Sequence, residues 1–312
     1  MQKLLVTGCA GFIGSHFVEE ALDMGDEVVG VDCLSYAGKL RNMSGFIDKI
    51  FFYQKDICSD TDVAEITKEH NPDWIINFAA ETHVDNAIES CDEFIRTNIS
   101  GTKALLEVCR QTDTKLMQIS TDEVYGTIAH GSFSEKSQLS PRNPYSATKA
   151  AAEHLIQAYS ATYGVRTKTV RMSNNFGPRQ DKEKFLPTII RKLRNGEKIP
   201  VYGDGTNIRD WLYVKDACKL LYTVLLRGNE NEVYNVTHNN EMTNLELIRH
   251  VTDILSINFH DNISFVNDRP GHDFRYSVDN SRLQDLGINI ATVFQEALKE
   301  TIKSWEELSS YE

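Results

Sequence analysis

The sequence has no excess of basic residues. It contains 33 lysines and arginines against 45 aspartates and glutamates, which gives a formal net charge of −12. A nucleic-acid groove needs a basic face to meet the phosphate backbone, and this composition does not supply one globally. We therefore expect no nucleic-acid partner, whereas a small anionic ligand held by a few local arginines is compatible with the charge.

Cysteines are few and scattered, and no two of them form a C-x-x-C pair. They stand at Cys9, Cys33, Cys58, Cys91, Cys109 and Cys218. Neither a zinc site nor a disulfide framework is indicated, and His83 and His272 lack a second histidine at ligand spacing. We expect no metal. Isolated thiols fit a reducing compartment, and we expect a cytoplasmic protein.

Long hydrophobic runs, internal repeats and linker-like tracts are also missing. The longest apolar stretch, residues 74–80, falls far short of the roughly 20 residues that a membrane helix needs. The first residues run straight into a strand-like KLLVTG without the basic and apolar regions of a signal peptide. We therefore expect no leader and no membrane partner.

Short apolar runs alternate with segments of helical periodicity. In a chain of 312 residues, 41% hydrophobic and 25% charged, this order predicts a globular α/β protein with a parallel, doubly wound sheet. The runs are almost continuously apolar, as a sheet covered on both faces requires. The expected strands are residues 3–8, 27–32, 49–57, 73–80, 115–121 and 165–177, and expected helices include residues 15–25 and 100–111.

A glycine-rich turn follows the first expected strand. Gly8, Gly11 and Gly14 allow a tight turn in which a pyrophosphate can approach the backbone at a helix N-terminus. Asp32 ends the second strand, where a carboxylate binds the adenosine ribose and repels a 2′-phosphate. We expect NAD rather than NADP. Asp56, after the third strand, is placed to reach the adenine, although a solvated carboxylate fits that position equally well.

The regular alternation of expected strands and helices ends at about residue 177. A helical stretch, a Gly-rich turn and further helices and strands follow. We assign residues 1–175 to a Rossmann-type NAD-binding domain, to which residues 208–237 return. Residues 176–312 form mainly a smaller α/β substrate lobe. Since no linker separates them, we expect the two parts to be packed together.

The segment NPYSATKAAAEHL has the marks of a helix start. Asn143 suits the N-cap and Pro144 the first turn. Tyr145 and Lys149 are four residues apart and share one helix face. A lysine cation beside a phenol favours the phenolate, so we expect Tyr145 to act as a base near neutral pH.

At these residues the chain resembles the extended short-chain dehydrogenase/reductase family, through TGCAGFIG, Asp32, NFAA and the Y-S-A-T-K segment. The resemblance covers essentially the whole chain. It implies a bound nicotinamide cofactor, with Tyr145 and Lys149 near its ring and Thr121 close to a substrate hydroxyl. The further cofactor contacts that it implies are Phe12, Ile13, Ser35, Asp56, Ile57, Ala79, Ala80, Thr97 and Asn175.

Two adjacent carboxylates follow Thr121 in QISTDEVYG. Asp122 and Glu123 come at the carboxyl end of an expected strand, where ligands bind in such folds, and they suit acid and base work on one substrate. An epimerase of the family usually has small residues here. The Thr-Asp-Glu triplet resembles that of the dTDP-glucose 4,6-dehydratases, and further matching segments are residues 32–38, 79–85, 173–178, 208–216 and 269–276.

The subfamily resemblance implies a sugar-nucleotide site. Its implied residues are Thr82, Thr121, Asn174, Lys184, Tyr202, Arg209, Asn244, Arg269 and His272. Guanidinium groups bind phosphate oxygens in bidentate fashion, although Arg209 or Arg269 alone could equally be a surface ion-pair partner. Residues 126–143 form a shorter stretch than in typical bacterial members, and the chain ends soon after Trp305, so the resemblance carries over no contacts there.

From the resemblance we expect a hydro-lyase of deoxysugar biosynthesis that uses NAD. Tyr145 serves C4 oxidation, Glu123 removes the C5 proton and Asp122 protonates the C6 oxygen. The alternatives are a dehydratase acting on a UDP-sugar, a 4-epimerase, and a non-catalytic NAD sensor, for which the acid and base groups would have no use. The resemblance also implies a homodimer, through helices around residues 100–110 and 150–163.

Overall fold

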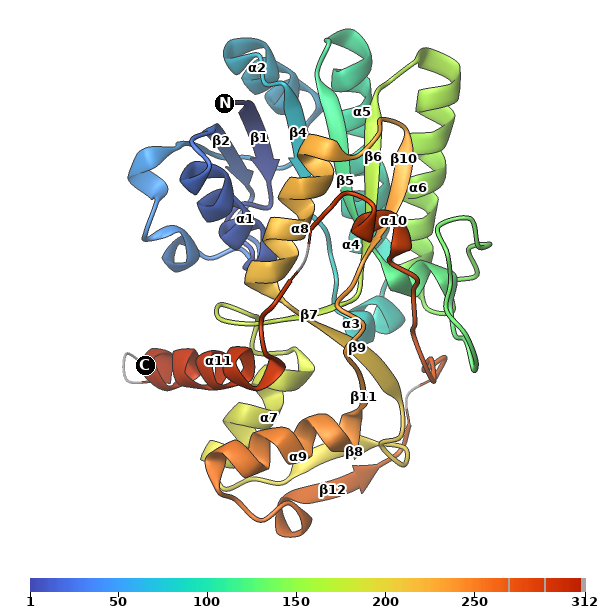
Figure 1. Ribbon diagram of the computed structural model, residues 1–312. Coiled ribbons are helices and arrows are strands. Elements are labelled where there is room, and N and C mark those ends of the chain that lie inside the picture. The colour runs from blue at the N-terminus through green and yellow to red at the C-terminus, as the bar shows by residue number, and fades with distance from the viewer. Residues whose placement is uncertain (269, 289, 310–312) are drawn as a thin grey trace.

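A parallel sheet of seven strands, in the order β3-β2-β1-β4-β5-β6-β10, forms the upper half of the molecule in Figure 1. The computed structural model describes residues 1–268, 270–288 and 290–309, so Arg269 lies outside the described residues. The strands of this sheet are β1 (Lys3–Thr7), β2 (Glu27–Asp32), β3 (Phe51–Gln54), β4 (Trp74–Asn77), β5 (Lys115–Thr121), β6 (Thr167–Met172) and β10 (Glu232–Val236). The expected Rossmann-type fold is confirmed.

Helices cover both faces of this sheet because successive residues of its strands, which point to opposite faces, are apolar. Leu4 and Val6 of β1 pack into one core with α1 (Phe12–Asp23) and α8 (Val214–Arg227). Leu5, between them, points to the other face. There it joins the core under α2 (Asp60–His70), α5 (Thr102–Gln111) and α6 (Pro144–Tyr163).

The lower half in Figure 1 contains smaller sheets. A three-stranded sheet, β11-β9-β7, and a two-stranded sheet, β12-β8, are accompanied by three helices. The strands are β7 (Asn174–Phe176), β8 (Ile199–Tyr202), β9 (Ile208–Tyr213), β11 (Glu241–Thr243) and β12 (Ile263–Val266), and the helices are α7 (Phe185–Arg194), α9 (Asn244–Leu255) and α11 (Phe294–Ser309). This half lies below the carboxyl ends of the long strands.

One expected strand is divided in the structure. The run of residues 165–177 breaks at Ser173, with β6 on one side and β7 on the other. β6 pairs with β5 and β10, whereas β7 pairs with β9 in the small sheet. The continuous strand that the sequence pattern predicts is therefore wrong at Ser173, because the chain changes sheet there, and this change brings residues 173–175 under the carboxyl end of the main sheet.

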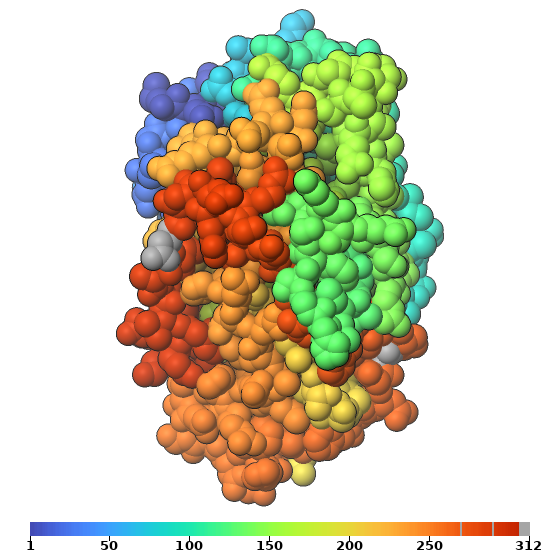
Figure 2. Space-filling model, turned by 45° about the vertical axis from the view of Figure 1, so that its right-hand side comes forward, coloured from blue at the N-terminus to red at the C-terminus, as the bar shows by residue number. Residues whose placement is uncertain are grey.

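Residues 126–143 lie on the surface as an extended segment. Phe133 forms an isolated parallel bridge with Val278, and its N–H donates to the Ser277 carbonyl at 2.9 Å. Figure 2 shows this green segment beside the orange-red chain near α10 (Ser281–Gln284).

Two small helices are α3 (Val84–Glu89) and α4 (Asp92–Phe94). No helix in the described part of the chain is long and apolar enough to cross a membrane.

Candidate active site

The glycine turn between β1 and α1 depends on three residues without a Cβ. Gly8 has a φ of +69°, and a Cβ there would lie 2.7 Å from the Ala79 backbone nitrogen. A Cβ on Gly14 would collide with the Gly8 carbonyl oxygen. Gly11 is the N-cap of α1 and makes no side-chain cap, so the first-turn N–H groups face the cavity described next. This arrangement suits a pyrophosphate.

A cavity of about 260 Å³ extends from this turn to the carboxyl end of β5. Ser173 Oγ, Asn174 Oδ1, Asn175 Oδ1 and Gln180 Oε1 are buried around it and have no hydrogen-bond partner among the described residues. Such atoms normally find a partner. Together with the glycine turn, they fit a dinucleotide whose amide and hydroxyl groups supply the missing bonds.

Asp32 lies at the end of β2, with both carboxylate oxygens aligned by the backbone. Its Oδ2 accepts from the Ala10 N–H at 2.9 Å and its Oδ1 accepts from the Leu34 N–H at 2.8 Å. Each carboxylate oxygen has a second lone pair for a ribose hydroxyl. Burial raises the pKa of Asp32, and the two backbone hydrogen bonds oppose that rise.

Thr121, Asp122 and Glu123 form the turn that ends β5. The Thr121 hydroxyl accepts from the Glu123 N–H at 3.2 Å and caps a short 3-10 helix, Asp122–Tyr125. Both carboxylates line the cavity. Burial and the neighbouring Glu123 carboxylate raise the pKa of Asp122 well above its usual range. Asp122 is therefore suited to hold a proton at neutral pH.

The surroundings of Glu123 differ from those of Asp122. Burial raises its pKa, and a hydrogen bond from Asn143 and the charges of Arg209 and Lys184 oppose that rise. The Asn143 amide donates to Glu123 Oε2 at 3.1 Å. The two adjacent acids thus differ in surroundings, as a paired acid and base require.

Tyr145 and Lys149 project from α6 into the same cavity. The helix starts as expected, because Asn143 Oδ1 accepts from the Ser146 N–H at 2.9 Å and Pro144 is the first helical residue. The expected effect of Lys149 on Tyr145 is not found, since the lysine ammonium donates to the Ile119 carbonyl oxygen at 2.6 Å.

The pKa of Tyr145 is instead raised, by burial and then by the Glu123 carboxylate, and a hydrogen bond with the Thr121 hydroxyl opposes this. Burial lowers the pKa of Lys149 to about 8, although Glu153 one turn further along α6 raises it. Burial and the Glu123 carboxylate thus favour the neutral phenol. Positive charge at this end of the cavity, of the kind an oxidised nicotinamide carries, would favour its ionisation.

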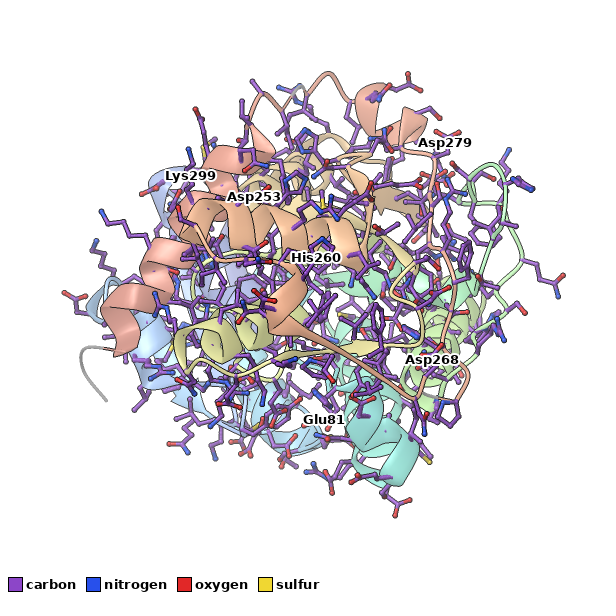
Figure 3. All side chains as sticks on the ribbon, turned by 90° about the horizontal axis from the view of Figure 1, so that it is seen from below. Glu81, Asp253, His260, Asp268, Asp279 and Lys299 are labelled. Atoms are coloured by element: carbon purple, nitrogen blue, oxygen red, sulfur yellow. The ribbon has the colours of Figure 1, made fainter. Side chains whose placement is uncertain are left out.

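A second cavity, of about 250 Å³, continues from the first into the lower half. Both cavities share Thr82, Glu123, Asn174 and Lys184 in their walls. Tyr202, Arg209, Asn244 and His272 line only the second one. Asp268, labelled at the end of β12 in the view from below of Figure 3, contacts His272 Nδ1 at 2.6 Å.

Arg209 is buried and its guanidinium is aligned by backbone carbonyls. It donates to the Ile208 oxygen at 2.7 Å and to the Asp273 oxygen at 3.0 Å, and it stacks 4.3 Å from the Tyr276 ring centre. The alternative of a surface ion-pair partner does not hold for Arg209. A positive charge in this cavity suits a diphosphate.

The residues predicted from the sequence fall into two groups. Most of the predicted cofactor and catalytic residues line the first cavity. Six predicted cofactor contacts are absent from its walls and stay predictions: Asp32, Ser35, Asp56, Ile57, Ala79 and Thr97. Asp56 accepts from the Cys58 N–H at 2.9 Å and pairs with Arg96. Sequence reasoning missed Ser173, Gln180, Asp181 and Tyr276, which lie in or next to matched segments.

The whole chain is similar to several known proteins. The family model for GDP-mannose 4,6 dehydratase matches residues 5–301. The dTDP-glucose 4,6-dehydratase of Xanthomonas campestris is 43% identical over 325 residues, which cover 97% of this chain and 92% of that protein. This agrees with the resemblance drawn from the Thr-Asp-Glu triplet.

Two crystal structures have folds similar to that of this chain. DesIV, the dTDP-glucose 4,6-dehydratase of Streptomyces venezuelae with NAD bound, superposes with a TM-score of 0.95 at 37% identity, over 99% of this chain and 98% of that one. UDP-glucose 4-epimerase of Thermotoga maritima with UDP-glucose has a TM-score of 0.91 at 27% identity, over 98% and 99%. The fold is common to both, whereas the family match is to dehydratases. This chain therefore belongs to the GDP-mannose 4,6-dehydratase family.

Proposed function

We propose that this chain is an NAD-dependent hydro-lyase that converts dTDP-glucose into the 4-keto-6-deoxy sugar nucleotide. The observation that carries the proposal is the pair Asp122 and Glu123, which line one cavity together with Tyr145. Loss of water across C5 and C6 needs a base for the carbon-bound proton and an acid for the leaving oxygen.

Each residue has one role in the reaction. Tyr145 accepts the proton of the C4 hydroxyl as that carbon becomes a carbonyl, and the carbonyl acidifies the C5 proton. Glu123 removes the C5 proton while Asp122 protonates the C6 oxygen, so that water leaves. When bound, NAD would supply the hydride acceptor for oxidation at C4 and later the hydride donor for C6, so that the net redox change is zero. As C6 receives the hydride, C5 regains the proton that Glu123 took.

Substrate recognition follows from the second cavity. Arg209 and Lys184 bring positive charge to its walls, as a nucleoside diphosphate requires. The comparisons with dTDP-glucose 4,6-dehydratases favour dTDP-glucose over a UDP-sugar. A 4-epimerase would use Tyr145 and Lys149 but has no use for the carboxylate pair, and an NAD sensor would need none of these groups.

Mass spectrometry separates these functions directly. The purified protein is incubated with dTDP-glucose and, in parallel, with UDP-glucose and its N-acetylated relative. A dehydratase produces a nucleotide sugar that has lost one water, whereas an epimerase conserves the mass. We expect loss of water with dTDP-glucose above all, and an unchanged mass with every substrate would contradict the proposal.

The Glu123→Gln variant separates oxidation from elimination. Oxidation at C4 does not use this carboxylate, so NADH absorbance should build up on the enzyme while water loss falls by 10²-fold or more. The measurement is single-turnover absorbance beside product analysis. If the variant makes 4-keto-6-deoxy product at close to the wild-type rate, Glu123 is not the base.

We also propose that the protein is a cytoplasmic homodimer. The six free cysteines are consistent with a reducing compartment. The helices α5 and α6 lie side by side over one face of the sheet, and Tyr163 at the end of α6 is 56% exposed. Light scattering of the purified protein and fractionation of its native cells test the two statements.

A further inference from the structure

The side chain of Asn143 makes two hydrogen bonds, one to the start of α6 and one to Glu123. Its side-chain oxygen accepts from the Ser146 N–H at 2.9 Å and so caps α6. Its side-chain amide donates to Glu123 Oε2 at 3.1 Å. The residue is 8% exposed, so water competes little for either bond. One side chain thus joins the start of the Tyr145 helix to the carboxylate at the end of β5.

The cap decides which end of the amide faces Glu123. An N-cap needs an oxygen toward the helix, because the first-turn N–H groups lack partners within the helix. With Oδ1 used in this way, Nδ2 is left on the side of Glu123. A group that only donates makes a stronger hydrogen bond to an ionised carboxylate than to a protonated acid, which has less acceptor capacity and carries no charge. The fold therefore fixes this contact as one that favours ionised Glu123.

Few other groups favour the ionised form of Glu123. Among the described residues, the cations Arg209 and Lys184 favour it, and burial and the Asp273 carboxylate act against it. Three titratable groups coupled to Glu123, namely Asp122, Tyr145 and Tyr276, carry or can carry negative charge. In these surroundings a single neutral donor has a large effect.

We infer that Asn143 is a positioning residue for the elimination step, which holds the Glu123 carboxylate ionised and oriented toward the carbon acid of the substrate. The inference rests on the proposed function. Asn143 does not contact the reacting atoms itself, and it acts through Glu123. It also links the base to Tyr145, since both positions are set from the same helix start.

Two substitutions keep the cap and change only the contact with Glu123. Serine and aspartate are N-caps about as good as asparagine. In Asn143→Ser the hydroxyl is too short to cap Ser146 and reach Glu123 together. In Asn143→Asp the shape is kept, but a carboxylate oxygen replaces the amide that faced Glu123. The first variant removes the donor, and the second replaces it with a like charge.

The expected effects concern elimination. Removal of the donor should slow product formation roughly 10- to 100-fold, as for one hydrogen bond to a charged group. A base works when deprotonated, so product formation rises with pH through the pKa of Glu123. Asn143 lowers that pKa. The acid limb of the pH profile should therefore move to higher pH in Asn143→Ser, and further in Asn143→Asp.

Two readouts distinguish this role from a structural one. The kinetic isotope effect with C5-deuterated substrate should increase in both variants, because proton removal from C5 becomes more rate-limiting. NADH formation from C4 oxidation should stay near the wild-type rate. Ser146→Ala is the matched control: Ser146 forms the other half of the capping box and has no contact with Glu123. Its product rate and pH profile should match the wild type.

The outcomes separate the inference from the function. If wild-type protein removes water from no sugar nucleotide, the proposed function fails. If the wild type is active and both Asn143 variants keep its acid limb and isotope effect, only the inference is overturned. The same holds if Ser146→Ala shifts the acid limb as far as Asn143→Ser does. Should Asn143→Ser fold poorly, the isosteric Asn143→Asp decides the question alone.

Discussion

Asp122 and Glu123 are adjacent in the sequence and have similar side chains, yet their surroundings differ. The pKa of both is raised, that of Asp122 well above its usual range. Asp122 is buried beside the Glu123 carboxylate, and among the described residues the Thr121 hydroxyl donates to it at 3.2 Å. Glu123 receives the Asn143 amide and faces two cations. This difference supports the proposed roles of Asp122 as the acid and Glu123 as the base.

Tyr145→Phe removes one oxygen atom and tests the first step, the oxidation at C4. The change removes little volume, so folding and NAD binding should survive, while C4 oxidation slows by about 10²- to 10⁴-fold, the usual effect of a general base. In the Glu123→Gln background it should suppress the NADH signal. Stopped-flow absorbance that develops equally fast with and without the hydroxyl would remove Tyr145 from the mechanism.

Asp32→Ala tests cofactor choice. The carboxylate would lie close to the 2′-phosphate of NADP, and its removal should lower the preference for NAD roughly tenfold or more. Some stability is lost too, because the Ala10 and Leu34 N–H groups lose their acceptor. Fluorescence titration with both nucleotides gives the ratio of dissociation constants. An unchanged ratio would mean that Asp32 does not select NAD.

At the scale of elements, α6 and β6 are joined by a buried ion pair. Tyr145, Lys149 and Glu153 succeed one another along α6 at intervals of four residues, so they share one face. Glu153 Oε2 pairs with Arg171 Nη2 of β6 at 2.6 Å, and both side chains are almost fully buried. Ser120 of β5 donates to the other Glu153 oxygen at 2.5 Å. The catalytic helix is thereby tied to the sheet.

Glu153→Gln should lower the free energy of unfolding by about 3 kcal/mol, because it leaves the Arg171 charge buried without a counter-charge. Adding Arg171→Met should restore a large part of this loss. Urea denaturation measures both. The exposed pair of Lys3 and Glu27 is the control, where Glu27→Gln should cost less than about 1 kcal/mol. Equal costs at the two sites would contradict the argument.

At the scale of the whole molecule, ion pairs connect the two halves across the cofactor cavity. Lys39, after β2, pairs with Asp181 at 2.8 Å, and Asp181 lines the cavity. Arg179 pairs with Glu19 of α1 and donates to the Asn42 carbonyl at 2.8 Å. The segment between β7 and α7 is thus fastened to the nucleotide-binding half. We expect these contacts to slow the release of a cofactor from this cavity.

Asp181→Asn should therefore speed the release of NAD about two- to fivefold, in line with the loss of a partly exposed ion pair. Competition with a labelled nucleotide measures the release rate. Glu197→Gln removes a comparable pair with Lys192, whose residues do not line the cavity, and should leave the rate unchanged. Equal release rates from the wild type and Asp181→Asn would show that the ion pair of Lys39 and Asp181 does not retain the cofactor.

Local patterns in the sequence were sufficient for the main elements of the fold. The glycine turn, the continuous apolar strands and the Asn143-Pro144 helix start depend on short-range sterics and on burial, which neighbouring residues specify. The Thr-Asp-Glu triplet was visible for the same reason, because its members are consecutive. The family followed from these segments, and the chemistry proposed for the site rests on them.

Other features depend on residues that are distant in the sequence, and only the tertiary structure decided them. No pattern indicates that the chain changes sheet at Ser173, because that break depends on pairing with β9. The contact of Asn143 with Glu123, and that of Lys149 with the Ile119 carbonyl rather than the phenol, both arise where α6 meets the end of β5. The pKa values of the acids follow from that packing, because burial and charge depend on which residues the fold brings together.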